Sequence, residues 1–458
     1  MFILIVKYKH INFSGVDKMK FTFKGGIHPY EGKELTEDKD VKEYLPKGDM
    51  VYPLSQHIGA PAKPVVKKGD RVLVGQLIAE AGGFVSANIH SSVSGTVKVI
   101  ENRLTSSGSK VNSIVIENDG QFEEADFAAN AISKPLDELT KDEILDAIKS
   151  AGVVGMGGAG FPTHVKLSPK EPDKIDTIIV NASECEPYLT SDYRRIIDEA
   201  DKVIGGLEIV LTMFPGAKGI IGIEDNKPKA IKLLKEKLAG RTDIVVNALK
   251  TKYPEGAERQ LIYANTGRYI NSNMLPADAG CIVHNVDTVY AIYEAVREGR
   301  PLIDRLVTVS GDAIEEPTNF VVRMGTSYKE LIEAAGGFKG TPEKIIAGGP
   351  MMGKAIYELD LPATKSSSAI LLMSKDEVAE FEPSACIRCG RCVDVCSGRV
   401  MPNALANAVE RDDMDTFMSL NGMECCECGC CSYICPAKRH LTQTIAGARK
   451  LVLANRKK

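Results

Sequence analysis

The sequence predicts an α/β protein of several domains, and three observations support that fold class. The chain has 458 residues, 44% of them hydrophobic, which is enough for three or four packed domains. Residues 50–117 alternate apolar and polar side chains as strands do, whereas residues 136–181 indicate a helix, a glycine-rich loop and a strand. Ten of the 12 cysteines lie within residues 386–396 and 425–435, which indicates a separate metal-binding domain.

Charge and hydropathy argue against two classes of protein. The formal net charge is −4, so the overall charge does not favour nucleic-acid binding. No apolar run approaches the roughly 18 residues of a membrane span, so we expect no transmembrane segment. The opening MFILIV is too short for the apolar core of a signal peptide. Because Met19 begins MKFTFKGGIHP, we expect residues 1–18 to be an extension from an upstream start codon.

The strand-rich stretch has the pattern of a structural module. Residues 65–80 alternate apolar and polar side chains around Gly69-Asp70 and Gly75-Gln76 turns, and residues 90–100 repeat the pattern. This pattern resembles the barrel-sandwich hybrid of biotinyl and lipoyl domains, which carry a prosthetic group on a hairpin lysine. No lysine lies between Lys68 and Lys98, so a swinging arm is excluded.

A glycine-rich loop follows the helix expected at residues 136–150. In this loop, Gly155, Gly157 and Gly160 satisfy the G-x-G-x-x-G spacing. Only FPTHVKL remains before Ser168-Pro169, which is too short for the crossover helix of a dinucleotide-binding βαβ unit. The glycines still let backbone N–H groups approach a phosphate. The next strand, DTIIVNASE, ends in polar residues, and ligands of open α/β sheets bind beyond such ends.

Residues 306–372 indicate a small mixed domain. We expect strands at 306–311, 320–327 and 344–349 and a helix at 328–337, an order that resembles the soluble-ligand-binding β-grasp (SLBB) module. The stretch GGPMMGKAI lacks the GK[ST] ending of a phosphate loop, so we interpret it as a structural turn next to the metal-binding domain.

Both cysteine runs have the C-x2-C-x2-C-x3-C spacing of bacterial ferredoxins, in which the fourth cysteine of each run binds the other cluster. The first [4Fe–4S] cluster is therefore assigned to Cys386, Cys389, Cys392 and Cys435. The second is assigned to Cys425, Cys428, Cys431 and Cys396. Structural zinc fits this spacing less well, and dense thiols without a secretory signal disfavour disulfides. The remaining four are interpreted as bystanders or small buried hydrophobes: Cys426, Cys430, Cys185 and Cys281.

The glycine loop, the polar strand end and two iron–sulfur clusters together indicate a flavin, which accepts a hydride and releases single electrons. GMGGAGFPTHVK followed by VNASECEPY resembles the flavin loop of the NADH-oxidising subunit of respiratory complex I. With FKGGIHP at 23–29, the barrel-sandwich stretch and the twin cysteine runs, the chain from Met19 onward resembles the C subunit of Rnf electron-transport complexes. Rnf complexes link ferredoxin and NAD through a membrane assembly that moves Na+ or protons.

The resemblance implies FMN as cofactor, NAD(H) as substrate and a role for each matching residue. The following would surround the flavin: Gly155, Gly157, Gly158, Gly160, Lys166, Asn181, Ser183, Glu184, Tyr253, Gly256, His284, Asn285 and Thr288. Glu186 and Phe161 would contact NADH, and Glu258 would lie on the same lining. The resemblance also implies other subunits of the membrane complex as partners, among them a ferredoxin-like one, indirect exchange with ferredoxin, and a peripheral place on the cytoplasmic face of the membrane.

Two hypotheses about function remain at this point. One is the membrane-complex subunit; the other is a soluble flavin and iron–sulfur relative that feeds a dedicated amino-acid or cobalamin reductase. Seven basic and no acidic residues follow Glu427, either as a solvated helix face or as a surface for an acidic protein or anionic lipid. The expected organisation is an extension at 1–18, a barrel-sandwich domain at 19–125, an α/β FMN- and NADH-binding domain at 126–305, an SLBB-type β-grasp domain at 306–375 and a helical two-cluster ferredoxin domain at 376–458.

Overall fold

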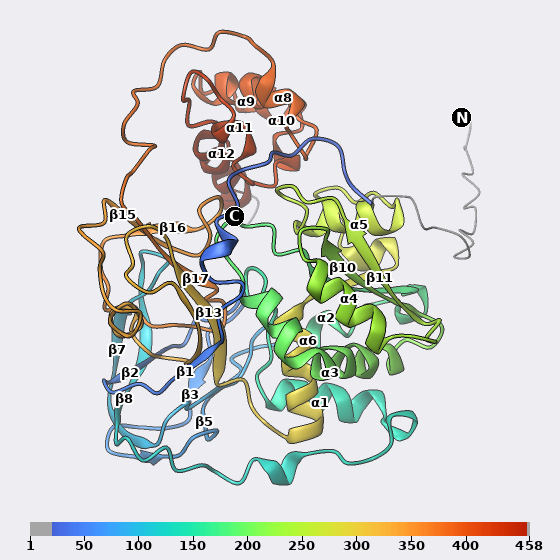
Figure 1. The fold of residues 1–458 in the computed structure, drawn as a ribbon, viewed down its shortest axis with the longest axis vertical. Coiled ribbons are helices and arrows are strands. Elements are labelled where there is room, and N and C mark those ends of the chain that lie inside the picture. Colours follow the sequence, from blue (N-terminus) through green and yellow to red (C-terminus); the bar gives the residue numbers. More distant parts are fainter. Residues whose placement is uncertain (1–20, 456–458) are drawn as a thin grey trace.

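The computed structural model describes residues 21–455, so the extension expected at residues 1–18 lies outside the described residues. These residues form four β-sheets and a C-terminal group of helices. In Figure 1 the C-terminal helices lie at one end of the molecule, beyond a β-rich part on one side and an α/β part on the other.

Two small antiparallel sheets make up residues 50–118. One has the strand order β2 (Met50–Pro53), β8 (Lys110–Asn118), β7 (Gly95–Leu104) and β4 (Arg71–Val72), and the other has the order β3 (Lys63–Pro64), β5 (Leu77–Glu80) and β6 (Ile89–His90). Inward side chains such as Tyr52, Ile78 and Ile114 share one buried core. The strands expected over residues 50–117 are therefore present.

A parallel sheet of four strands occupies the middle of the chain, in the order β11 (Ile244–Leu249), β10 (Lys218–Glu224), β9 (Thr177–Ala182) and β12 (Cys281–Asn285). Ile220 and Val283 both pair with Ile179 in register. The accompanying helices are α1 (Lys141–Ser150), α2 (Thr163–Lys166), α3 (Ser191–Thr212), α4 (Pro228–Lys237), α5 (Glu258–Thr266) and α6 (Val286–Tyr293). Both faces of the sheet are buried, and all four strands end at one edge.

Helix α1 begins later than the sequence pattern predicts. The expected helix spanned residues 136–150, but residues 136–138 form a separate 3₁₀ turn and α1 begins at Lys141. The Thr140 side chain accepts from Glu143 N, and the Glu143 carboxylate accepts from Thr140 N. This capping box fixes the start of the helix, because it satisfies N–H groups that have no partner within the helix.

A mixed sheet of six strands follows, in the order β1 (Lys42–Tyr44), β14 (Thr318–Arg323), β13 (Asp304–Ser310), β17 (Ala369–Met373), β15 (Lys344–Ala347) and β16 (Lys354–Ile356). Helix α7 (Tyr328–Ala334) packs on it through Leu331 and Ile332. The sequence pattern predicted β13, β14, α7 and β15. Strand β1 comes from the N-terminal segment and pairs in parallel with β14, so segments far apart in the chain share this sheet.

Residues 391–455 are mainly helical: α8 (Arg391–Asp394), α9 (Pro402–Val409), α10 (Met414–Ser419), α11 (Cys430–Tyr433) and α12 (Leu441–Asn455). Short 3₁₀ turns lie at Lys33–Leu35, Ala128–Asn130, Leu136–Glu138, Pro172–Lys174, Pro276–Ala279 and Gly422–Glu424, and a π-helical turn lies at Glu294–Glu298. Within residues 21–455, no helix combines the length and apolar character that crossing a membrane would require.

Candidate functional site

Three loops meet at the carboxyl edge of the parallel sheet, and the glycine loop joins them. The loops follow β9, β11 and β12. The glycine loop lies against the end of β12, because a Cβ at Gly157 would be 2.9 Å from Asn285 Cβ. Met156 N also donates to Thr288 Oγ1 at 3.0 Å. Gly157 and Gly158 are exposed, so their backbone borders open space at the edge where ligands of such sheets bind.

The loop after β9 is fixed by hydrogen bonds. Asn181 Nδ2 donates to Gly256 O at 2.9 Å, and Asn181 Oδ1 accepts from Ser183 N at 3.2 Å. Glu184 Oε1 accepts from Asp192 N in the first turn of α3 at 2.7 Å, where the helix dipole favours a negative charge. Burial raises the pKa of Glu184. These bonds tie the loops after β9 and β11 together.

Several buried polar atoms at this edge have no hydrogen-bond partner within the described part of the protein, among them Ser183 Oγ, Glu184 Oε2 and Tyr253 Oη of the loops and His284 Nε2 of β12. Glu184 Oε2 lies 3.9 Å from Lys33 Nζ, within ion-pair distance. Leaving a buried polar atom unpaired costs about 1–3 kcal/mol, so such a group is expected where a ligand supplies the partners. Burial lowers the pKa of His284 to about 3, so the ring is neutral. The hydroxyl, carboxylate and imidazole groups fit the hydroxyls and ring heteroatoms of FMN, and the exposed glycines leave room for a phosphate.

Three further residues of the expected flavin and nicotinamide lining, Lys166, Glu258 and Phe161, lie beside these loops. Lys166 Nζ donates to Val283 O at 2.9 Å and lies 3.4 Å from Glu258 Oε1, at the start of α5. Phe161 O accepts from Gly155 N at 2.8 Å, which closes the glycine loop. The same loop touches the barrel-sandwich sheets, since Ile58 N donates to Gly160 O at 3.3 Å.

Glu186, expected at the nicotinamide site, is held by the GGPMMG stretch. Its Oε1 accepts from Met352 N at 2.9 Å and its Oε2 from Met351 N at 3.1 Å. Burial raises the pKa of Glu186 to about 7. Each carboxylate oxygen retains a further lone pair, so a substrate hydroxyl can still donate to it. The turn between β15 and β16 thus orients a carboxylate of the α/β part.

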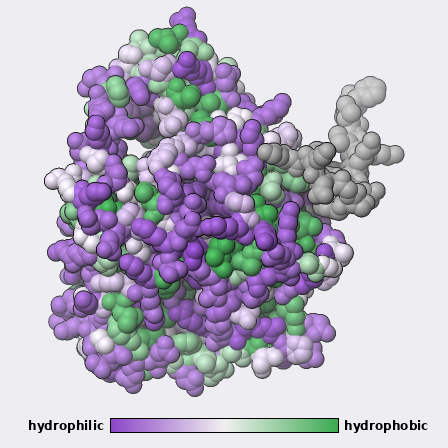
Figure 2. Space-filling view, in the orientation of Figure 1, coloured by the Kyte–Doolittle hydropathy of each residue, from purple (hydrophilic) through white to green (hydrophobic). Residues whose placement is uncertain are grey.

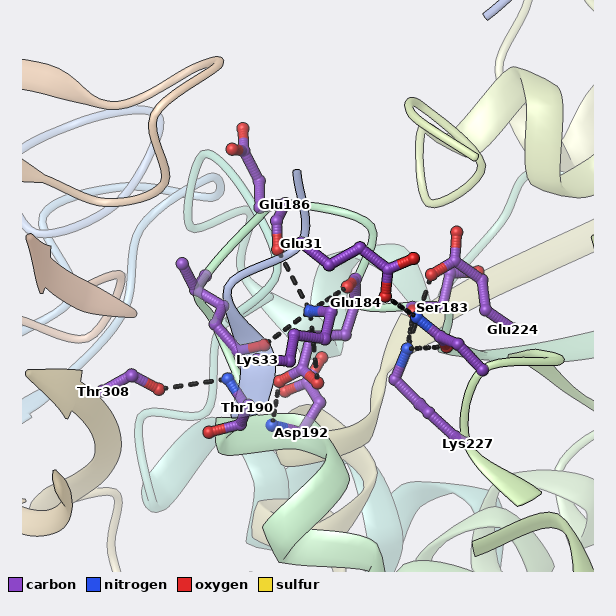
Figure 3. Close-up of polar contacts among 12 residues, drawn as sticks. Glu31, Lys33, Ser183, Glu184, Glu186, Thr190, Asp192, Glu224, Lys227 and Thr308 are labelled. Atoms are coloured by element: carbon purple, nitrogen blue, oxygen red, sulfur yellow. Dashed lines mark hydrogen bonds and ion pairs between the residues drawn. The ribbon is translucent and has the colours of Figure 1, made fainter. Parts of the chain in front are cut away.

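Sequence reasoning missed Lys33, which anchors the N-terminal segment to this loop (Figure 3). Its Nζ donates to three carbonyl oxygens, at 2.6–3.1 Å: those of Glu184, Glu186 and Leu189. Lys227 supports the same loop, because its Nζ donates to Ser183 O at 2.6 Å and lies 3.4 Å from Glu224 Oε2. No local pattern marks Lys33, since the nearest of these three partners in sequence is 151 residues away.

Sequence reasoning also missed Glu255, which precedes Gly256 in the loop after β11. Its side chain is fully buried, and neither carboxylate oxygen has a partner among the residues that the structure describes. Burial raises the pKa of Glu255 to about 9, so the carboxyl group is protonated at neutral pH. Glu255 lies between Tyr253 and Gly256, two residues that the resemblance assigns to the flavin lining, and that position was the available signal.

The two cysteine runs pack together, and the fourth cysteine of each run lies beside cysteines of the other run. One cavity is lined by Cys386, Cys389 and Cys392 of the first run and by Cys435 of the second. Cys396 and Cys425 pack against the same buried cluster. Burial raises the pKa of Cys425 and Cys431 to about 11. Ser397 Oγ lies 3.9 Å from Cys428 Sγ. The structure thus places Cys435 with the first run and Cys396 with the second.

No three or more His, Cys, Asp or Glu side chains between residues 21 and 455 are arranged to hold a single metal ion. A cubane differs from a single ion because each thiolate binds its own iron. All 12 cysteines are free thiols. Two of the expected bystanders have other neighbours: Cys426 Sγ lies 3.5 Å from Ser397 Oγ, and Cys430 Sγ lies 3.8 Å from Tyr253 O.

The basic C-terminal residues are less available than their sequence suggests. Arg439 pairs with Glu410 at 2.5 Å, and Arg449 pairs with Glu427. Lys438 lies over the Phe381 ring, 4.5 Å from its centroid. The last three basic residues, 456–458, lie outside the described part of the chain. Of the two alternatives, a solvated helix face or a surface for an acidic partner, Arg439 and Arg449 contribute less charge to the second because they are paired within the protein.

Three family models match the chain. The RnfC barrel sandwich hybrid domain matches residues 21–121, the Nuo51 FMN-binding domain matches residues 148–294, and the SLBB domain matches residues 306–355. These matches confirm the barrel-sandwich, flavin and β-grasp types of domain. The loops described above, from the glycine loop to Thr288, lie within the match to the FMN-binding domain.

Curated relatives match over most of their own length. The C subunit of the proton-translocating ferredoxin:NAD(+) oxidoreductase complex of Clostridium ljungdahlii is 48% identical over 85% of both chains. The C subunit of the Na(+)-translocating complex of Acetobacterium woodii is 44% identical over 95% of this chain and 98% of that one. The C subunit of the Rhodobacter capsulatus ion-translocating oxidoreductase complex is 39% identical over 86% of this chain and 76% of that one. An NAD+-reducing [NiFe]-hydrogenase structure is similar only at TM-score 0.49 and 19% identity, covering 69% of this chain and 65% of that one.

Proposed function

The chain belongs to the family of C subunits of ion-translocating ferredoxin:NAD(+) oxidoreductase complexes, and we propose that it passes electrons between NAD(H), a bound FMN and two [4Fe–4S] clusters. The family assignment favours this function over a soluble relative that feeds an amino-acid or cobalamin reductase. The protein would then be one subunit of a membrane oxidoreductase whose electron transfer is coupled to ion movement.

One observation supports the flavin site most directly. Buried polar atoms without a hydrogen-bond partner, among them Ser183 Oγ, Tyr253 Oη and His284 Nε2, and the exposed glycines lie at the carboxyl edge of a parallel sheet, inside the match to an FMN-binding domain. FMN at this edge would accept a hydride and release electrons one at a time. The backbone N–H groups from Gly157 to Gly160 and the Lys166 ammonium would bind the phosphate, and Ser183, Glu184 and His284 would bind polar groups of the flavin.

The nicotinamide site is assigned to Phe161, Glu186 and Glu258, which border the same loops. The N–H groups of Met351 and Met352 keep the Glu186 carboxylate in one orientation, so it loses little conformational freedom when a dinucleotide hydroxyl donates to it. Phe161 would supply an apolar face for the substrate. These side chains would orient the nicotinamide for hydride transfer to the flavin.

The two clusters are assigned to the crossed cysteine sets. The cavity among Cys386, Cys389, Cys392 and Cys435 supports the first set, and the packing of Cys396 and Cys425 against one buried cluster supports the second. Cys430 touches Tyr253 in the loop after β11, residues 250–257, which we call the flavin-side loop; this contact favours a second set nearer the flavin. Cys389 is exposed, so the first set is nearer the surface from which electrons would pass to a partner.

Other subunits of the complex, including a ferredoxin-like one, are the proposed partners. Figure 2 shows apolar side chains gathered on the end of the molecule formed by α8–α12, where Ile387, Val393 and Met401 are exposed. Arg388 and Arg391 flank the exposed Cys389. A carrier with an acidic rim would suit this surface. We place the subunit on the cytoplasmic face of the membrane, held there by its partners.

Cofactor content tests this proposal. Protein purified without oxygen should contain one FMN and about eight irons per chain, the content of two cubanes. It should be brown and should bleach with dithionite. Stoichiometric zinc without visible absorbance would contradict the cluster assignment, and absence of FMN from protein that contains iron would contradict the flavin site.

A further inference from the structure

A short N-terminal segment, residues 23–27, lies between the flavin-side loop and the second cysteine set; we call it the bridging segment. Ile27 N donates to Tyr253 O at 2.8 Å, and Tyr253 N donates back to Ile27 O at 2.9 Å. On its other side, Gly26 N donates to Val395 O at 2.9 Å. Figure 1 shows this part of the chain running between the C-terminal helices and the α/β part. One segment therefore contacts both proposed cofactor regions.

The two glycines of the bridging segment leave no room for a side chain. Gly25 has φ +86°, and a Cβ there would lie 2.9 Å from Val395 O and 3.0 Å from the carbonyl of Cys396. Gly26 has φ +84°, and a Cβ there would lie 2.8 Å from Tyr253 O. Both the backbone conformation and the close approach require glycine. The backbone of Cys396, a proposed cluster ligand, thus rests directly on Gly25.

Lys252 closes the bridging segment onto the loop after β11. Its Nζ donates to Gly25 O at 3.1 Å and to Phe23 O, and it lies 3.9 Å from the centroid of the Phe23 ring. Beyond the segment, Ile27 and Tyr253 share a buried cluster with Cys430. The flavin-side loop, the bridging segment and the second cysteine run therefore form one continuous packed unit.

We propose that the bridging segment is a positioning element that sets the separation between the flavin-side loop at Tyr253 and the second cluster at Cys396. Its residues touch no reacting group, and they act through the backbone of these two residues. Helix α5 makes a separate contact with the same domain, since Gln260 Nε2 donates to Ser397 O at 3.2 Å. Arg259 and Ser272 also bond the Glu424 carboxylate, next to Cys425. The Cys396 backbone bonds within its own run to Val393 and Arg399, and Gly25 of the bridging segment packs on it from the flavin side. The proposal rests on the proposed flavin and cluster sites.

Gly25→Ala tests the proposal, with Gly69→Ala as its matched control. Gly69 has a similar φ of +90°, but a Cβ there would meet no atom within 4 Å, so only Gly25→Ala displaces a neighbour. We expect faster hydrogen–deuterium exchange at residues 249–256 and 395–400 in Gly25→Ala alone. In a stopped-flow experiment with NADH, we expect flavin bleaching at the wild-type rate but slower cluster bleaching. Lys252→Met should have the same effects to a smaller degree, since it removes only the bonds to Gly25 and Phe23.

The outcomes separate this inference from the function on which it rests. If Gly25→Ala and Lys252→Met match Gly69→Ala in both exchange and cluster bleaching, the bridging segment does not position the second cluster. If Gly25→Ala does not fold, the exchange and cluster-bleaching rates of Lys252→Met test the proposal instead, because that substitution introduces no backbone strain. If the wild type binds no FMN or no iron, the proposed function fails. Faster exchange in the variants would then show only that the bridging segment holds the backbone near Tyr253 and Cys396 in place.

Discussion

Gly158 is the residue at which flavin binding and folding can be separated. It is exposed at the carboxyl edge of the parallel sheet, and a Cβ there would meet no protein atom within 4 Å. We expect Gly158→Val to fold normally and to lose FMN, because the side chain enters space that the ligand needs. Flavin released on denaturation measures occupancy. Gly447→Val, at another position without neighbours within 4 Å, should keep full flavin, and full flavin in Gly158→Val would place the ligand elsewhere.

Glu186 is the residue that tests the nicotinamide site. Glu186→Gln should weaken NADH binding by about 1–3 kcal/mol, the scale of a lost hydrogen bond to a charged group, without changing flavin or iron content. Because burial raises the pKa of Glu186 to about 7, wild-type affinity should also fall as the pH drops below 7, and the variant should lack this dependence. Binding titrations across pH measure both effects.

Glu358→Gln is the matched control for that experiment. Glu358 also accepts hydrogen bonds from two backbone N–H groups, those of Leu359 and Asp360, but it is exposed and both donors belong to its own turn. Its substitution should leave NADH affinity unchanged. Equal affinity of Glu186→Gln and wild type at every pH would remove Glu186 from the nicotinamide site.

The fourth cysteine of each run should be a ligand of the cluster that the other run binds with its first three cysteines. Cys435→Ala removes a residue of the second run, yet it should damage the cluster whose other ligands are in the first run, because it lines their cavity. Iron content should fall from about eight toward about four per chain. Iron analysis and the spectrum of the dithionite-reduced protein measure this. Cys426→Ala, at an expected bystander, should retain all the iron; loss of iron there would mean that the second set is wrongly assigned.

Local patterns predicted the elements better than the contacts between them. Alternation in residues 65–80 and the spacing of the cysteine runs depend on neighbours within a few residues, so one sequence suffices to see them. The start of α1 was missed because the capping box at Thr140 outweighs the apolar periodicity before it. The pairing of β1 with β14 and the bonds of Lys33 join segments far apart in the chain, and no local pattern specifies them.

At the scale of the whole molecule, one buried lysine joins the barrel-sandwich part to the stretch before the glycine loop. Lys365 is 1% exposed, and its Nζ donates to Gly152 O at 2.6 Å, just before the glycine loop, and to Asn88 O in the barrel-sandwich part. Burial lowers its pKa from 10.5 to about 7. Between those two pH values the unfolded chain holds a proton that the folded protein lacks, so this site makes the folded protein more stable as the pH rises. Below pH 7 the full cost of burying the charge is present.

Lys365→Met should therefore change how stability depends on pH. As the pH rises from 7 to 10, the wild-type melting temperature should increase relative to that of the variant. Two nearby groups do not interfere: burial and the charge of Lys365 lower the pKa of His57 to about 4 and that of His90 to about 3, so both stay neutral in this range. Differential scanning calorimetry across pH measures the difference, and parallel profiles for the two proteins would contradict a neutral buried lysine.

An anaerobic NADH titration of the isolated protein, followed by its visible spectrum, tests the electron path from end to end. The protein should contain FMN and both clusters at the start. NADH should bleach the flavin first and the iron–sulfur absorbance after it, because the nicotinamide site borders the flavin loops and Cys430, which lies next to the cluster ligand Cys431, contacts these loops at Tyr253. If NADH bleaches neither group in fully loaded protein that dithionite reduces readily, the nicotinamide site and the direction of the path are both contradicted.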